Sequence, residues 1–367
     1  MRILRVAQNL YPEVPGGGSY HVHAMSRDQA AMGHDVTVLT VTDRDDLPRR
    51  EQRDGYTVVR RTPTVTVLGN AISRGVVSYL RSATGVDVVH AHSHLYFSTN
   101  VAAADRRLGG DETPLAVTNH GLYSQSAPEW VFRWYLRTLG RWTFDQADVA
   151  FCYTDADERR LREYGVAVPV RVVPNGIDTE RFTPEGPTSD RIDHDGPVLL
   201  FVGRLVAGKR PRDTVDALAG LPAGLDAKLY LAGDGSLRSA VRERASERGV
   251  ADRVELLGRV PYEEMPRIFR SADCLVLPSR AEGLPRTVLE AFASGVPAVT
   301  SRLDQTREIV ETGGRTVTVG DVAGYVESIE AVLSQRESLG NAGRRLVVAD
   351  HQWADTVAET TRHLESL

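Results

Sequence analysis

The stretch that decides the fold is Ser279–Glu290, which reads SRAEGLPRTVLE. It follows an apolar run, Cys274 to Leu277, that is typical of a buried strand, and it leads into a helix expected to continue to about Ser294. Gly283 lets the backbone come close to a ligand, and Pro285 suits the first position of a helix. A strand, a glycine-containing turn and a helix in this order predict a helix start that can bind an anion.

Two carboxylates flank this helix start, Glu282 before the helix and Glu290 inside it. A carboxylate beside a phosphate would repel it, so these two groups are better suited to accepting hydrogen bonds from hydroxyls. A ligand that carries sugar hydroxyls around a phosphate would suit both the anion-binding helix start and the two carboxylates.

The whole run from Pro278 to Pro297 resembles the Glu-x7-Glu signature of the family-4 retaining glycosyltransferases. The resemblance implies the GT-B architecture, an α/β fold in which two Rossmann-like parallel-sheet domains face a cleft. It also implies a hexosyltransferase-like, metal-independent enzyme. The competing interpretation of the same run is an ordinary strand, turn and helix with solvated glutamates.

The composition sets broad limits on the class of protein. A length of 367 residues suits two domains at roughly 150 residues each. The net charge of −5 argues against bulk nucleic-acid binding. Cys152 and Cys274 both lie in apolar runs and indicate buried thiols in a reducing compartment. No apolar run approaches the ~20 residues of a membrane span, and a strand begins at Ile3 without room for a signal peptide, so we expect a cytoplasmic protein.

Apolar strand-like runs alternate with helical stretches in both halves of the chain, which predicts parallel sheets covered by helices on both faces. The expected strands are Ile3–Ala7, Val36–Val41, Val86–His90, Leu115–Asn119, Val149–Tyr153, Val198–Val202, Lys228–Ala232, Val254–Leu257, Cys274–Leu277 and Ala298–Ser301. The polar stretch that begins at Thr183 is the expected linker. We therefore place an acceptor-side domain at 1–183 and a nucleotide-sugar-binding domain at 184–352. The resemblance implies that a last helix, 353–367, completes the first domain.

A basic loop follows the first strand of the second domain. Gly203 and Arg204 end that strand, and Lys209 follows five residues later. Arg204 can grip two phosphate oxygens, whereas Lys209 acts as a point charge. Only two lysines, Lys209 and Lys228, stand among the 44 Lys and Arg residues, so a lysine kept in this loop favours a function. The alternative is a solvated basic loop.

Glycines mark two further loops. A helix is expected from about Tyr20 to Met32, and Gly17 and Gly18 precede it in a loop that we expect to approach the donor phosphate or the acceptor. Gly233 lies in a tight turn expected near the nucleotide. In both places the alternative is a plain turn.

Histidines end two strands of the first domain. His90, His92 and His94 alternate but lack a nearby acidic or thiol partner, so cleft lining or packing is favoured over a metal site. His120 matches the family's histidine near the acceptor and the transferred sugar, where a neutral imidazole can orient a hydroxyl. The alternative for His120 is a hydrogen-bonded core histidine.

One loop departs from the family pattern. Relatives usually carry two glycines after the strand that ends at Ser301, whereas this chain has Asp304, Gln305 and Thr306. Because of this departure, the family's role for the loop does not transfer directly to this chain. The different residues are candidates for changing which donor sugar is used.

The predicted function is transfer of a sugar from a nucleotide-sugar donor to a hydroxyl acceptor, either a glycan, a lipid-linked saccharide or a small molecule. The competing functions are a nucleotide-sugar epimerase on the same fold and a non-catalytic nucleotide-sugar-binding protein. We expect no cofactor besides the donor substrate, no metal and no nucleic acid, and the residues do not distinguish uridine from guanosine donors. The expected catalytic residues are His120, Arg204, Lys209 and Glu282. The expected donor-binding residues are Gly17, Gly18, Gly203, Arg204, Lys209, Gly233, Gly283, Leu284, Pro285 and Glu290.

An aromatic and basic segment spans residues 130–144. It holds three of the four tryptophans, and Arg133, Arg137 and Arg141 recur at helical spacing. Leu139 and Trp142 are expected on the opposite, core-facing side. The first interpretation is a helix with solvated arginines; the second is peripheral contact with the inner face of an anionic membrane, near a lipid-linked acceptor.

Overall fold

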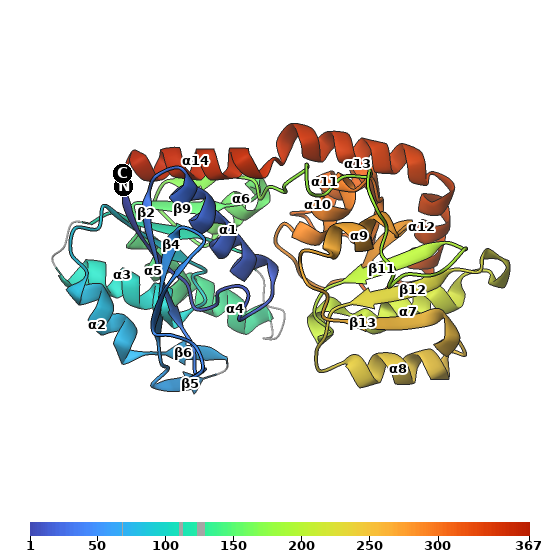
Figure 1. Ribbon diagram of the computed structural model, residues 1–367, viewed down its shortest axis with the longest axis horizontal. Helices are drawn as coiled ribbons and strands as arrows, with labels where there is room; N and C mark the ends of the chain where they lie inside the picture. Colours follow the sequence, from blue (N-terminus) through green and yellow to red (C-terminus); the bar gives the residue numbers. More distant parts are fainter. Residues whose placement is uncertain (68, 110–112, 123–128) are drawn as a thin grey trace. The chain divides into compact units, whose positions relative to one another are not determined.

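A computed structural model describes residues 1–67, 69–109, 113–122 and 129–367. Among these residues, 1–122, 129–174 and 356–367 form one compact unit, and 175–355 form a second. Each unit is built on a largely or wholly parallel sheet with helices packed against it (Figure 1). The predicted α/β fold class is therefore confirmed.

The first unit contains an eight-stranded sheet with the order β10-β9-β8-β7-β1-β2-β4-β3. All pairs are parallel except β3 with β4. Its strands, with the separate pair β5–β6, are β1 (Arg2–Val6), β2 (Asp35–Val41), β3 (Arg50–Arg53), β4 (Tyr56–Arg61), β5 (Val65–Val67), β6 (Asn70–Ile72), β7 (Val88–His92), β8 (Leu115–Thr118), β9 (Val149–Cys152) and β10 (Val170–Val172).

The helices of the first unit follow its strands in the order expected of a Rossmann-like sheet. They are α1 (Gly17–Ala31), α2 (Arg74–Ser82), α3 (Phe97–Gly109), α4 (Glu129–Tyr135), a π-helical turn η1 (Leu136–Gly140), α5 (Arg141–Asp145) and α6 (Asp155–Glu163). Helix α1 begins earlier than the predicted Tyr20, so Gly17 and Gly18 form its first turn and not a preceding loop. Leu364, near the end of α14 (Trp353–Glu365), packs in the apolar core of this unit.

The second unit contains a six-stranded, all-parallel sheet with the order β13-β12-β11-β14-β15-β16. Its strands are β11 (Val198–Val202), β12 (Lys228–Ala232), β13 (Val254–Gly258), β14 (Cys274–Leu277), β15 (Ala298–Ser301) and β16 (Gly314–Val317). Its helices are α7 (Pro211–Gly220), α8 (Arg238–Glu247), α9 (Met265–Arg270), α10 (Arg286–Ala293), α11 (Arg307–Gly313), α12 (Val322–Ser334) and α13 (Arg336–Asp350), with short 3₁₀ turns η2 (Ala207–Lys209), η3 (Ala223–Leu225) and η4 (Ala251–Arg253). The central strands are apolar because both faces of the sheet are covered.

The chain passes from the first unit to the second at residues 174 and 175, ahead of the boundary that the sequence predicts at 183 and 184. The physical reason lies in the backbone of Ile177. Its N–H donates to His351 O at 2.8 Å, and its carbonyl accepts from Trp353 N at 3.1 Å. These contacts hold the segment after Pro174 within the second unit, and they join partners too far apart in sequence for composition to reveal them.

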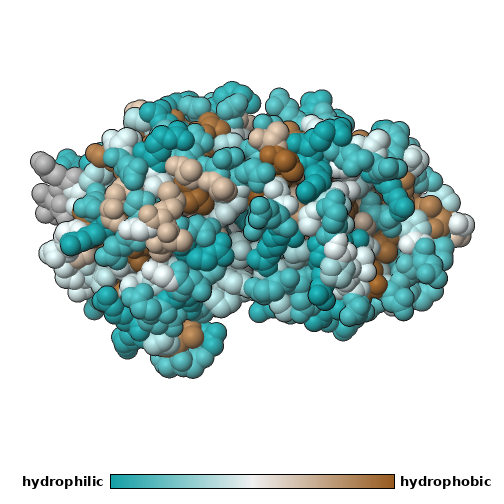
Figure 2. All heavy atoms as spheres, turned by 45° about the horizontal axis from the view of Figure 1, so that its top comes forward, coloured by the Kyte–Doolittle hydropathy of each residue, from teal (hydrophilic) through white to brown (hydrophobic). Residues whose placement is uncertain are grey.

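Apolar side chains at the surface are limited in the view of Figure 2. That face is mainly hydrophilic, and its apolar residues form small separate groups. No helix in the described part of the chain is long and apolar enough to cross a membrane.

Candidate functional site

Four loops lie together at the carboxyl ends of the strands in the sheet of the second unit. Strands β12, β11, β14 and β15 are neighbours, so the loops that follow them leave the sheet side by side. Backbone hydrogen bonds join these loops: Leu205 N donates to Asp234 O at 2.9 Å, and Arg280 N donates to Gly208 O at 2.8 Å. The predicted site residues on these loops are Gly203, Arg204, Lys209, Gly233, Glu282, Gly283, Leu284 and Pro285.

The loops after β11 and β12 lie so close together that the loop after β12 needs glycine. A Cβ on Gly233 would lie 1.9 Å from the carbonyl oxygen of Gly203, and a Cβ on Gly235 would lie 2.5 Å from that of Leu205. Gly233 and Gly235 also have φ of +147° and +158°, where side chains are strained. Gly233 therefore has a structural reason to be glycine, independent of any ligand.

Lys209 Nζ and Glu282 Oε1 form an ion pair between the loops after β11 and β14. Their side chains are 13% and 9% exposed. Because the pair is largely buried, each side chain holds the other in place. An incoming phosphate would compete with Glu282 for the ammonium group of Lys209, and that exchange would leave the carboxylate available to a hydroxyl. Arg204 lies on the same loop with an exposed side chain.

Helix α10 starts directly after Pro285, which occupies the N-cap position. No side chain caps this helix start. Its first N–H groups and partial positive charge can therefore attract an anion. Leu284 is buried and anchors the turn, whereas Gly283 places no side chain over the backbone. The helix start and Glu282 thus combine anion donors with a hydroxyl acceptor within one short segment.

Glu290 is buried in the second turn of α10, with 3% exposure. Tyr262 Oη donates to its Oε1 at 2.9 Å, and Arg286 Nε lies 3.7 Å from the same oxygen. Burial raises the pKa of the Glu290 carboxyl above its usual range, although Arg286 and the hydrogen bond from Tyr262 oppose the shift. Among the described residues the carboxylate receives no further hydrogen bond, so Oε2 keeps the capacity to accept one from a ligand hydroxyl.

Arg286 connects this carboxylate to the places where the chain enters and leaves the second unit. Its Nη2 donates to Tyr262 Oη at 3.2 Å, and its Nη1 donates to Gly176 O at 3.2 Å. Its guanidinium also lies over the ring of Trp353, 5.5 Å from the ring centroid. The helix that carries Glu290 therefore contacts both the segment where the chain enters the second unit and the segment where it leaves that unit.

In the first unit, His120 is held through both ring nitrogens. Tyr153 Oη lies 2.7 Å from Nδ1, and His92 Nδ1 lies 3.0 Å from Nε2. Burial lowers the pKa of His120 to about 4, so the imidazole is neutral near pH 7. A Cβ on Gly18 would lie 3.7 Å from this ring, which places the first turn of α1 beside it. A hydroxyl ligand of His120 would have to replace one of its two present partners.

The three alternating histidines occupy separate surroundings. His90 Nε2 lies 2.7 Å from Thr118 Oγ1, His92 contacts His120, and His94 is enclosed by aromatic rings such as that of Phe144. Burial holds the pKa values of all three well below the usual range of histidine. Over the described ranges, no three His, Cys, Asp or Glu side chains are placed to hold a metal ion.

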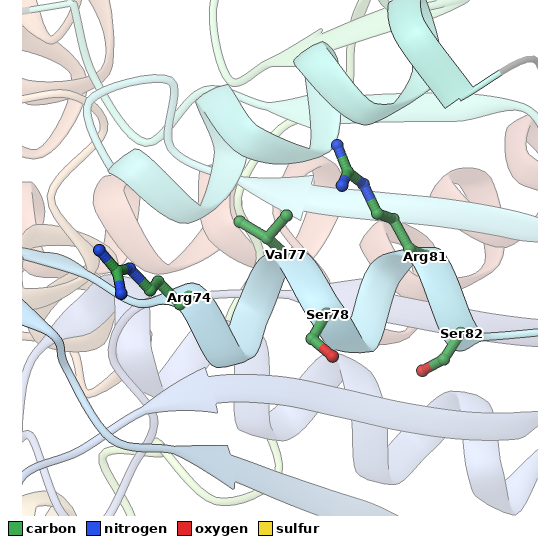
Figure 3. Close-up of a pocket in the computed structure, with 5 residues that line it drawn as sticks. All are labelled: Arg74, Val77, Ser78, Arg81 and Ser82. Atoms are coloured by element: carbon green, nitrogen blue, oxygen red, sulfur yellow. The ribbon is translucent and has the colours of Figure 1, made fainter.

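A shallow hollow runs along α2, and Figure 3 shows its five lining side chains, Arg74, Val77, Ser78, Arg81 and Ser82. All five come from one helix, and Arg81 extends to an ion pair with Asp105 at 3.5 Å. Ligand sites normally combine apolar walls with a few converging polar groups. Side chains from one helix face do not provide this, so the hollow is not the candidate site.

The aromatic and basic segment forms a helical stretch through α4, η1 and α5. Phe132 and Leu136 are buried, as the sequence predicts for the core side, and Phe144 is buried as well. The expectation for Leu139 and Trp142 is wrong, because these side chains are 44% and 37% exposed. A π-helical turn inserts an extra residue, which rotates everything after it by about 100° relative to a regular helix.

Exposed apolar side chains lie before, within and after the π-helical turn. We define the tryptophan surface as the exposed side chains of Trp130, Trp134, Leu139 and Trp142. Arg133, Arg137 and Arg141 are also exposed, and Arg141 pairs with Asp145 at 3.1 Å. Trp130 and Trp134, at 67% and 68% exposure, are the most exposed large apolar side chains of the described chain.

Several contacts at these sites escape sequence reasoning. Tyr262 and Arg286 hold Glu290, Tyr153 holds His120, and Gln305 donates to the backbone carbonyl of Glu282. The departure from the family pattern after Ser301 is the one signal that points to Gln305. The others carry no motif, because they depend on strand order that the sequence does not show.

The family model described as "Glycosyltransferase Family 4" matches residues 15–181, and the model for "Glycosyl transferases group 1" matches residues 184–346. The D-inositol 3-phosphate glycosyltransferase of Geodermatophilus obscurus is 31% identical, over 93% of this chain and 83% of its own.

Two further proteins are similar over nearly their whole length. The GDP-mannose-dependent alpha-(1-6)-phosphatidylinositol monomannoside mannosyltransferase of Mycobacterium tuberculosis is 28% identical, over 97% of this chain and 96% of its own. The structure of Anabaena HepE in complex with UDP-glucose has a TM-score of 0.82 at 20% identity, with 100% of both chains covered. At that identity the likeness concerns the fold.

Proposed function

The chain belongs to glycosyltransferase family 4, and we propose that it moves a sugar from a nucleotide-sugar donor to a hydroxyl acceptor with retention of anomeric configuration. The observation that carries the proposal is the joint placement of Lys209, Glu282 and the uncapped start of α10 at one sheet edge. Cationic and N–H groups there suit a diphosphate, and the neighbouring carboxylate suits a sugar hydroxyl.

Each charged residue of the predicted site has a part in this proposal. Lys209, Arg204 and the N–H groups of α10 stabilise the charge that develops on the departing nucleoside diphosphate, which makes the reaction independent of a metal. Glu290 accepts a ribose hydroxyl through Oε2, while its Oε1 remains bonded to Tyr262. Glu282 accepts a hydroxyl of the transferred sugar once the diphosphate has drawn Lys209 away from it.

Neutral His120 suits hydrogen bonding to a sugar hydroxyl better than proton transfer. We assign it the orientation of the transferred sugar or the acceptor. Among the residues that the structure describes, we assign no carboxylate as the nucleophile of a double displacement. Departure of the leaving group and attack by the acceptor therefore take place on one face of the sugar, and the chain contributes chiefly positioning and leaving-group stabilisation.

The test begins with donor binding, because the names of the similar proteins include both GDP-mannose and UDP-glucose. A panel of UDP- and GDP-sugars is screened by thermal shift, in which a bound ligand stabilises the chain by RT ln(1 + [L]/Kd). Nucleotide release from the stabilising donor is then measured with and without hydroxyl acceptors. We expect release that depends on an acceptor. Conversion of the donor alone would establish the epimerase, and stabilisation without turnover under any acceptor would establish a binding protein.

The tryptophan surface favours a lipid-linked acceptor over a free sugar. Tryptophan rings and arginines suit the headgroup region of an anionic membrane. The mannosyltransferase relative, by its name, acts on a phosphatidylinositol monomannoside, which is a lipid. Arginines near such a surface contribute roughly 1 kcal/mol each, so the attachment is weak and sensitive to salt.

A further inference from the structure

The turn after β15 carries a buried side chain, Gln305, that the proposed mechanism does not use. Its side chain is 5% exposed, and Thr306 N donates to Leu303 O at 3.0 Å to close the turn around it. Strand β15 runs parallel to β14, with Thr300 opposite Leu277. The turn therefore leaves the sheet beside the loop that carries Glu282.

Gln305 Nε2 donates a hydrogen bond to the backbone carbonyl oxygen of Glu282. A carbonyl oxygen only accepts, so the amide must present its NH₂ group here, and the orientation of the amide is fixed by chemistry. The segment around Glu282 is thus held at three points. Gln305 holds its carbonyl, Lys209 holds its side chain, and Gly208 O accepts from Arg280 N at 2.8 Å.

The hydrogen bond controls the peptide that joins Glu282 to Gly283. This peptide is trans, so its C=O and N–H point in opposite directions. With the carbonyl held by Gln305, the N–H of Gly283 is directed away from the β15 turn. Glycine has little conformational preference of its own. Without the amide of Gln305, the peptide could therefore rotate and turn that N–H elsewhere.

We propose that Gln305 is a positioning residue that determines which donor sugar the chain accepts. The inference rests on the proposed function, which places the transferred sugar at Glu282. Rotation of this peptide would move both the Gly283 N–H and the backbone from which the Glu282 carboxylate projects. Gln305 forms no hydrogen bond with Glu290 or Tyr262 in the described chain, so the nucleotide end of the donor does not depend on it.

The test compares Gln305→Met, which keeps the length of the side chain but loses the amide, with the wild type. Gln335→Met is the matched control, because Gln335 is exposed and lies in the same unit. Thermal unfolding of both variants checks that they fold. Affinities are measured for a nucleoside diphosphate and for two nucleotide sugars that differ in one hydroxyl configuration, such as the glucose and galactose donors, and kcat and KM are measured with each sugar.

We expect Gln305→Met to bind the nucleoside diphosphate as the wild type does. Its preference between the two sugars should fall about tenfold, which is the size expected from one hydrogen bond. The kcat on the preferred donor should fall more than KM rises. Gln305→Glu provides a rescue, since only a protonated carboxyl can donate to Glu282 O. Its kcat relative to the wild type should rise as the pH is lowered from 8 to 6.

An unchanged sugar preference in Gln305→Met, with wild-type binding of the nucleoside diphosphate, would overturn the inference and leave the proposed function intact. Equal loss of diphosphate and sugar affinity would also overturn it, because that pattern indicates a general structural role. A wild-type chain that binds no nucleotide sugar would instead remove the proposed function, and Gln305 would lose its role with it.

Discussion

Lys209 and Glu282 are joined by an ion pair that passes from the loop after β11 to the loop after β14, although 73 residues separate them in the chain. In a largely buried pair, removing one partner strands the charge of the other. Substitutions that keep the charge are therefore more informative here than alanine, because they separate the role in catalysis from the role in stability.

Lys209→Arg should keep the ion pair and the fold but lose activity. A guanidinium fork differs in shape from the compact ammonium group that the proposed phosphate site requires. We expect a loss of about a hundredfold in kcat/KM, or about 3 kcal/mol, comparable to removal of one oxyanion donor. The other lysine provides the control: Lys228 pairs with Glu255 at 3.0 Å, and Lys228→Arg should be silent. Full turnover by Lys209→Arg would place its loop outside the donor site.

Glu290→Gln and Glu282→Gln should have different kinetic effects. If Glu290 holds the ribose, its loss weakens nucleotide affinity and raises KM more than it lowers kcat. If Glu282 contacts the transferred sugar, its loss lowers kcat, whereas the affinity for the nucleoside diphosphate is not weakened, because Lys209 no longer pairs with a carboxylate. Titration of each variant with the diphosphate alone separates the two roles. Equal affinities in both variants would contradict the assignment.

Asp157 should make stability depend on pH. It is buried in the first turn of α6, where its N–H donates to Thr154 Oγ1 at 3.1 Å, and burial raises the pKa of its carboxyl from 3.8 to about 6. The unfolded chain loses this proton near pH 4, but the folded chain keeps it until about pH 6. The contribution of Asp157 to the free energy of unfolding therefore falls as the pH rises from about 4 to 6, by up to about 3 kcal/mol, and levels off above.

Asp157→Asn should remove this pH dependence and raise the free energy of unfolding at pH 7. Urea denaturation at pH 4.5, 5.5 and 7 measures the effect. Asp155→Asn is the control, because Asp155 lies exposed in the same turn. An Asp157→Asn variant that is less stable than the wild type at pH 7 would show that the carboxylate is stabilised in the folded chain.

The tryptophan surface should bring the chain to anionic vesicles. We expect flotation of the wild type with anionic vesicles at low salt, loss of flotation at high salt, and little flotation with neutral vesicles. A triple Arg→Gln variant at 133, 137 and 141 should float less, and Trp130→Ala with Trp134→Ala should lower it further. If the wild type and all variants fail to float with every vesicle, the membrane proposal fails and a soluble acceptor is favoured.

Short apolar strands were the most predictable part of this fold. Four strands, β11, β12, β14 and β15, begin and end at the predicted residues. Each is an apolar run buried between covering helices, so burial and propensity give the same boundaries. At the sheet edges the signal varied: β13 was predicted to within one residue, whereas β3, β10 and β16 were not predicted. In β16, Arg315 is exposed, and the β3–β4 pair begins with charged residues that resemble a loop.

The positions of the candidate residues at strand ends and at a helix start were predictable, but their contacts were not. Glu282, Lys209 and the start of α10 follow from strand ends and turn chemistry. Their ion pair, and the contact of Tyr262 with Glu290, depend on which strands are neighbours in the sheet. The exposure of Trp142 follows from a π-helical turn, which helical periodicity cannot anticipate.

The scarcity of lysine makes Lys209 chemically addressable. Lys209 and Lys228 carry the only side-chain amines among 44 Lys and Arg residues, and each pairs with a different carboxylate on a different loop or strand. An amine-selective reagent would therefore modify two side chains, and mass spectrometry could follow them separately. Acylation of Lys209, normalised to that of Lys228, would report occupancy of the phosphate position directly, without a fluorescent ligand or an enzymatic assay.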